Sequence, residues 1–184
     1  EGHLRRLPRL RRVYFGREVE RHSLDEGLHR LQRKAERVTD TLPLLEEFYR
    51  EKIALLLAHQ AAAKLVVQYD ANNTYQYIIN RDDVQLSWVG KAIELLGGTL
   101  PEGSEPTRGA KGKAGAAASR VIAEDGHAAQ AFVDRWRPRV EAMTHARHRT
   151  MLRVILGETL EQKRFFEQAL AGRTDLLGRR GEVL

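Results

Sequence analysis

Apolar residues recur at spacings of three and four along most of this chain, as they do in helices that bury one face. The pattern predicts four long helices, over 43–69, 74–96, 116–137 and 144–170. No segment alternates apolar and polar residues in the way of a half-buried strand. The sequence therefore predicts an all-α protein.

Residues that favour turns and caps mark the expected ends of these helices. A turn is predicted at 70–74, where Asn73 or Thr74 is suited to cap the following helix. Thr144 is expected to cap the last helix. Pro138 is expected to bend or end the third, because proline cannot donate a backbone hydrogen bond.

A long connection separates the second predicted helix from the third. Gly97-Gly98 should end the second helix, since glycine adopts the left-handed cap without strain. Residues 99–116 are rich in Pro and Gly and form a linker long enough to cross from one end of a bundle to the other. The order of hairpin, long crossover and hairpin predicts a four-helix bundle over 43–172, followed by a tail over 173–184.

The N-terminal segment, 1–42, is predicted to be a basic arm and a short extra helix that begins at the capping box of residues 23–26. Residues 1–22 hold seven arginines and three glutamates, so they carry +4 of the chain's net charge of +6. A basic arm favours an acidic protein face or a polyanion such as nucleic acid. The residues expected to bind a partner are Arg5, Arg6, Arg9, Arg11, Arg12 and Arg17.

Composition narrows the class of protein. The 184 residues include no cysteine, which excludes disulfides, thiolate zinc sites, iron–sulfur clusters and cysteine nucleophiles. Hydrophobic residues make up 42% of the chain and charged residues 30%. No apolar run is long enough to be a transmembrane segment. We expect a cytoplasmic protein with one main core.

Two segments resemble parts of a known family. Residues 93–101, Ile-Glu-Leu-Leu-Gly-Gly-Thr-Leu-Pro, resemble the end of the second helix in ferritin-like proteins. Residues 160–167, Leu-Glu-Gln-Lys-Arg-Phe-Phe-Glu, resemble the end of that family's fourth helix. The resemblance covers roughly 43–171 and implies a ferritin-like four-helix bundle. In that family each hairpin supplies a Glu and a Glu-x-x-His that hold two iron ions.

Antiparallel pairing maps this motif onto the chain, because it places Asp82 level with Gln60, and Glu124 level with Thr159. Both histidine positions then hold glutamine, and two carboxylates remain of the four. Glutamine can donate and accept, so a hydrogen-bonded polar core is expected in place of a metal site. Its predicted members are Gln60, Asp82, Gln85, Glu124, Thr159 and Gln162.

A different register leaves a metal site open. A shift of one residue offers Asp83, Asp125, Glu158 and Glu161 instead. Glu124-x-x-His127 also has the spacing of a metal-binding pair on one helical face. Iron would then be the cofactor of a non-standard site. The ligands available to it are Asp82, Glu124, His127, Glu158 and Glu161.

Two functions follow from these alternatives. The preferred hypothesis is a non-catalytic bundle, without cofactor, that acts as a structural or interaction subunit. It would dock on partner proteins through its arginine-rich arm, in a homo- or hetero-oligomer. The alternative is a ferritin-like oxidase or hydroxylase, or an iron-handling protein, with a di-iron or mononuclear site.

Overall fold

The computed structural model describes residues 41–103 and 114–178, and the account that follows is confined to them. The chain divides into two units, Glu1–Asp40 and Thr41–Leu184, so all the described residues belong to the second unit. The predictions for the arginine arm and the short extra helix lie outside the described residues, as do 104–113 of the predicted linker and 179–184 of the predicted tail. Within the described residues, no helix has the length and apolar character needed to cross a membrane.

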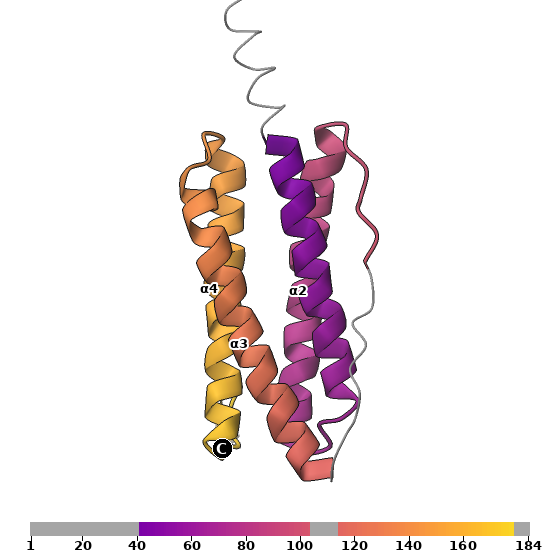
Figure 1. Ribbon diagram of the computed structural model, residues 1–184, viewed down its shortest axis with the longest axis vertical. Helices are drawn as coiled ribbons and strands as arrows, with labels where there is room; N and C mark the ends of the chain where they lie inside the picture. The colour runs from indigo at the N-terminus through magenta and orange to yellow at the C-terminus, as the bar shows by residue number, and fades with distance from the viewer. Residues whose placement is uncertain (1–40, 104–113, 179–184) are drawn as a thin grey trace, which may run out of the picture. The chain divides into compact units, whose positions relative to one another are not determined.

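Helices make up most of the described chain, and no strand occurs in it (Figure 1). Residues 41–63 form a helix that we call the first helix, drawn in indigo in Figure 1. The others are α2 (Tyr69–Leu95), α3 (Ala114–Glu141) and α4 (Ala146–Leu170). The all-α four-helix bundle predicted from the apolar spacing is therefore confirmed.

Contacts between the helices give their directions. Arg139 of α3 donates two hydrogen bonds to Glu47, at 2.9 and 2.5 Å, and Trp136 donates from Nε1 to Glu51 at 2.7 Å. Higher residue numbers in α3 thus lie beside lower numbers in the first helix, so these helices are antiparallel. Since each hairpin is also antiparallel, α2 and α3 run in the same direction, as Figure 1 shows.

The connection after α2 therefore has to return along the bundle, as a crossover does. A Cβ added to Gly98 would lie 2.5 Å from Leu42, and one added to Gly103 would lie 2.8 Å from Ile53. The described part of the connection thus already travels along the first helix. Gly97, with φ of 81°, ends α2 where the sequence predicted its end.

The first turn lies earlier than predicted. The first helix ends at residue 63 and α2 begins at Tyr69, where Gln68 is the N-cap and its side chain accepts from Ala71 N at 2.6 Å. Asn72 donates its amide to the carbonyls of Ala63 and Val66, both at 2.8 Å. Asn72 therefore satisfies the end of the first helix from inside α2, and neither Asn73 nor Thr74 is the cap.

Two predicted boundaries in the second hairpin are also wrong. The third helix does not end at Pro138, which lies inside α3, and α3 continues to Glu141. Pro138 and Asp134, whose carbonyl loses its usual donor, are both exposed, so water can satisfy that carbonyl. The N-cap of α4 is His145 and not Thr144, because the imidazole accepts from His148 N at 3.3 Å.

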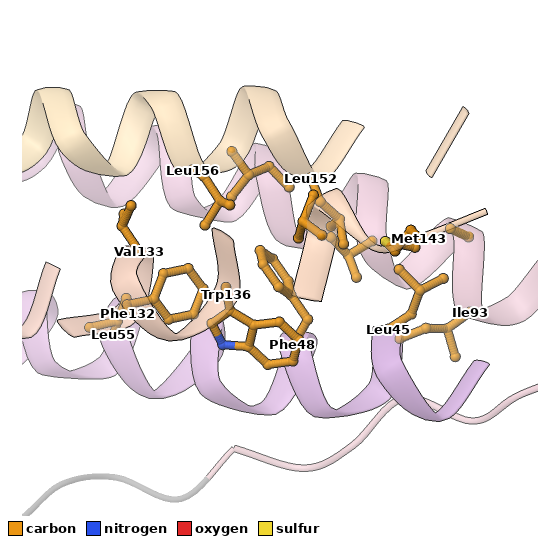
Figure 2. Close-up of a cluster of buried hydrophobic side chains, with 14 residues drawn as sticks. Leu45, Phe48, Leu55, Ile93, Phe132, Val133, Trp136, Met143, Leu152 and Leu156 are labelled. Atoms are coloured by element: carbon orange, nitrogen blue, oxygen red, sulfur yellow. The ribbon is translucent and has the colours of Figure 1, made fainter. Parts of the chain in front are cut away.

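The buried apolar side chains form two clusters. The first core cluster lies towards the turn between α3 and α4, and Figure 2 shows Phe48, Phe132 and Trp136 meeting in it. Phe48 packs edge-on against Trp136, with ring centroids 4.9 Å apart. The second core cluster lies towards the turn between the first helix and α2, and includes Tyr75 and Phe166. A layer of polar side chains separates the two clusters.

Candidate functional site

The buried polar layer is the most unusual feature of the described bundle. Its side chains are at most 3% exposed, and they come from the first helix, α2 and α4. Polar groups removed from water in this way must bind one another, since each unpaired one destabilises the fold. We define the layer as Lys52, His59, Asp82, Gln85, Thr159 and Gln162.

Asp82 is the centre of the layer. Its Oδ1 accepts from Lys52 Nζ at 2.7 Å and from Gln162 Nε2 at 2.6 Å. Its Oδ2 lies 2.9 Å from Nδ1 of His59, which must donate because an ionised carboxylate can only accept. One carboxylate thus joins three helices.

The charge of Asp82 is kept by its neighbours. Burial alone raises the pKa of Asp82, but the positive charge of Lys52 and the hydrogen bond from His59 outweigh burial and lower this pKa to about 2. Asp82 is therefore ionised at neutral pH. The ammonium group of Lys52 is its buried counter-ion.

Lys52 reaches a second helix as well. Its Nζ lies 3.4 Å from Thr159 Oγ1, which itself donates to the carbonyl of Ile155 at 2.9 Å. Lys52 Nζ also lies 5.9 Å from the centre of the Phe132 ring, which belongs to the first core cluster. Lys52 therefore links the polar layer to the first core cluster.

A second acid closes the layer at its outer edge. Gln85 donates from Nε2 to Glu158 Oε2 at 2.6 Å. Arg81 holds the same carboxylate with both Nε, at 3.1 Å, and Nη2, at 2.5 Å. Arg81 and Glu158 are each about a third exposed, so this pair lies between the layer and solvent.

A separate buried pair lies in the neighbouring second core cluster. The hydroxyl of Tyr75 donates to Asp125 Oδ2 at 2.6 Å, and both side chains are almost completely buried. The ring of Phe166 packs against Tyr75, with centroids 5.3 Å apart, and against His59, at 5.5 Å. The Tyr75–Asp125 pair therefore adjoins the polar layer through aromatic contacts.

The structure brings together four of the six residues predicted for the polar core: Asp82, Gln85, Thr159 and Gln162. The prediction is wrong for Glu124, whose side chain is 52% exposed and pairs with Arg120 on the surface of α3. Asp125, the next residue, is buried instead.

A second error of one residue affects the first helix. Gln60 is only partly buried, and its neighbour His59 contacts Asp82 in its place. On a helix one residue is a rotation of about 100°, which is enough to turn a side chain from the core to the surface. The predicted level along the bundle was right in the first hairpin, where His59 beside Gln60 meets Asp82. It was wrong in the second hairpin: Glu141 pairs with Arg153 and Gly126 lies against Phe166, so residue 124 lies beyond Phe166 along α4 and is not level with Thr159.

The alternative metal ligands are not gathered in one place. His127 and Glu161 are exposed, and Glu161 pairs with Arg164 on the surface. Asp82 is bound by Lys52, and Glu158 by Arg81. Among the residues described, no three His, Cys, Asp or Glu side chains lie close enough together to hold a metal ion.

The donors of the polar layer do not fit a di-iron centre. A ferritin-like centre uses four carboxylates and two imidazoles. Here the layer offers one carboxylate and one imidazole, and a lysine ammonium already contacts the carboxylate. Gln85 Oε1, Gln162 Oε1 and His59 Nε2 are buried without a protein partner, but amide oxygens and an imidazole nitrogen carry no negative charge and cannot balance the charge of two iron ions.

Lys52 was not among the predicted members of the polar core, although its position carried a signal. Buried positions of the first helix recur at spacings of three and four from Leu45 through Phe48, Lys52 and Leu55 to His59. A lysine and a histidine on this stripe have to enter the core, where each needs a polar partner. Asp82 is that partner for both.

Comparisons with known proteins add no family. Neither a protein-family model, nor a curated protein, nor a solved structure matches this chain. Any statement on function therefore rests on the residues and contacts described above.

Replacing Lys52 tests the energetic weight of the central pair. Lys52→Met should destabilise the bundle by roughly 3–5 kcal/mol, because it leaves the Asp82 carboxylate buried without a counter-ion. The double variant Lys52→Met/Asp82→Leu should recover part of this loss, since it removes both charges. Urea denaturation measures both values, and Lys91→Met on the exposed face of α2 is the matched control. Equal losses in the single and the double variant would contradict the assignment.

The lowered pKa of Asp82 predicts a pH dependence with a definite sign. Because the folded state holds this carboxylate ionised, its contribution is present above pH 4 and disappears as the pH falls towards 2. About 2 kcal/mol of unfolding free energy should be lost over this window. Denaturation between pH 2 and pH 6 measures it, with Asp82→Asn compared with Asp83→Asn on the exposed neighbour. The acid-dependent loss should shrink only in Asp82→Asn.

Proposed function

We propose that this chain is a non-catalytic, ferritin-like helical bundle that acts as a structural or interaction subunit and needs no metal to close its interior. The observation that carries the proposal is the buried ion pair between Lys52 Nζ and Asp82 Oδ1 at 2.7 Å. It supplies a fixed positive charge beside the central carboxylate, which is what a metal ion supplies in a ferritin-like centre.

The rest of the layer supports the same proposal. His59 and Gln162 occupy two further hydrogen-bonding positions of Asp82 beside the one that Lys52 takes, so the carboxylate has little capacity left for a ligand. If Asp82 serves only to hold the helices together, it needs no access to solvent. We therefore expect the surface of the bundle and its N-terminal arm to carry the function.

The arm gives the proposal its partner. Seven arginines within residues 1–22 concentrate positive charge in one segment, and they favour an acidic protein face. A segment this rich in charge gains little from a core of its own, so we expect it to bind another chain.

Metal analysis tests the non-catalytic interior. Protein produced with excess iron should contain well below one iron per chain by elemental analysis, and its melting temperature should be the same with and without a chelator. Glu124→Ala should leave both readings unchanged, because Glu124 lies on the surface. About two irons per chain, lost on Asp82→Ala, would instead support the oxidase or iron-handling alternative.

Changing the arm tests the docking role. A tagged full chain should retain partner proteins from a native lysate of its source, and high salt should release them. Replacing Arg5, Arg6, Arg9, Arg11, Arg12 and Arg17 by serine should abolish this retention, whereas replacing the same six by lysine should keep part of it. A full chain that retains nothing would remove the basis for an arm-docked subunit.

A further inference from the structure

An apolar stripe runs along the outer side of α2. Tyr77, Val84, Trp88 and Leu95 are 46%, 41%, 38% and 68% exposed. Their successive spacings are seven, four and seven, which together make five full turns of an α-helix and return to the same side. The stripe is therefore a single line about 27 Å long, on the flank of α2 that borders α4.

The stripe continues onto α4. The rings of Tyr77 and Phe165 lie 6.2 Å apart, and Gln85 contacts Glu158, so α4 runs antiparallel beside α2. The Tyr77–Phe165 and Gln85–Glu158 contacts place the middle of the stripe level with residues 154–158 of α4. Val154, which is 46% exposed, adds a further apolar side chain at this level.

A glycine without an internal explanation lies at the same level. Gly157 is in the middle of α4, its φ is not positive, and a Cβ added there would meet nothing within 4 Å. Glycine in a helix interior is less stable than alanine, and nothing in the described bundle requires it here. A residue without a side chain allows another helix to approach closely.

The order of residues in the stripe is symmetric about the level of Leu86, whose own side chain is buried on the opposite face of α2. Val84 and Trp88 lie two positions on either side of this level, and Tyr77 and Leu95 lie nine positions on either side. In an isologous interface residue i contacts residue j of the partner, and j contacts i in return. Two antiparallel copies of α2 centred at this level would place Val84 against Trp88, and Tyr77 against Leu95.

We propose that this stripe is the interface of a two-fold symmetric homodimer, with a second copy of this chain as its occupant. The proposal rests on the interaction role proposed above and names one partner for it. The dimer axis crosses the stripe at the level of Leu86, where Gly157 of each copy gives room for the other. Trp88 is the central anchor, as aromatic residues are in most interfaces.

The charges beside the stripe fit a second copy better than an acidic or a basic partner. Arg81 pairs with Glu158, and Lys91 with Glu94, inside the same chain. Two copies can therefore approach without bringing unbalanced like charges together. A stripe of this length with α4 beside it matches a small isologous interface, of roughly 800 Å² per partner or less.

Sedimentation velocity of the full chain at high salt tests the dimer, because salt suppresses association through the arm but not apolar contact. The wild type should reach twice its 21.0 kDa mass as its concentration is raised. Val84→Glu should weaken the dimer at least roughly tenfold. Val67→Glu makes the same change at a residue that is 81% exposed but lies off the stripe, and should leave the dimer intact.

Disulfide cross-linking tests the geometry independently of any variant that weakens the dimer. The chain has no cysteine, so Ser87→Cys adds a single thiol next to the proposed axis, on an exposed position of α2. It should give a cross-linked dimer on mild oxidation. Gln76→Cys, on an exposed position of the same helix, is the control. It should not cross-link, because antiparallel copies would hold the two thiols roughly 30 Å apart along the helix axis.

A wild type that stays monomeric, or a dimer equally stable in Val84→Glu, would overturn the proposal. So would cross-linking through Gln76→Cys in preference to Ser87→Cys. None of these results bears on metal content or on retention of partners by the arm, so failure of the dimer is distinguishable from failure of the proposed function.

Discussion

The pair of Lys52 and Asp82 is the interaction on which the described bundle depends. Each charge is removed from water, and each is tolerable only because the other is present. The pair also fixes the orientation of each helix about its own axis, since Asp82 receives hydrogen bonds from His59 on the first helix and Gln162 on α4. Apolar clusters on either side pack well only when these three helices are in that rotation.

A polar layer between two apolar clusters selects one arrangement more sharply than apolar packing does. Apolar side chains tolerate small rotations, because their attraction has no direction. Hydrogen bonds do not, since an unmet buried donor or acceptor loses its interaction with water and gains nothing. The same requirement leaves Asp82 little freedom to serve as a ligand or a base. This is the physical link between the closed interior and the proposal that the chain functions through its surface.

Helix α2 contributes both to the closed interior and to the surface. One side carries Asp82 and Gln85 into the layer, and the other carries Tyr77, Val84 and Trp88 outward. Both sets follow helical spacing, so periodicity alone does not say which one is core. The contacts with the first helix and α4 decide it, and they leave the outer set more than a third exposed.

The sequence by itself determined the all-α class, the crossover after Gly97 and, in the first hairpin, the level at which polar residues meet, because the spacing of apolar residues and the glycine stop after α2 are local properties. Only the tertiary structure decided that His59 and Asp125, and not Gln60 and Glu124, turn inward. The orientation of a helix about its own axis depends on all its contacts with the neighbouring helices. The sequence around one residue does not give those contacts. The same reason hid the partner of Lys52, which lies thirty residues away on another helix.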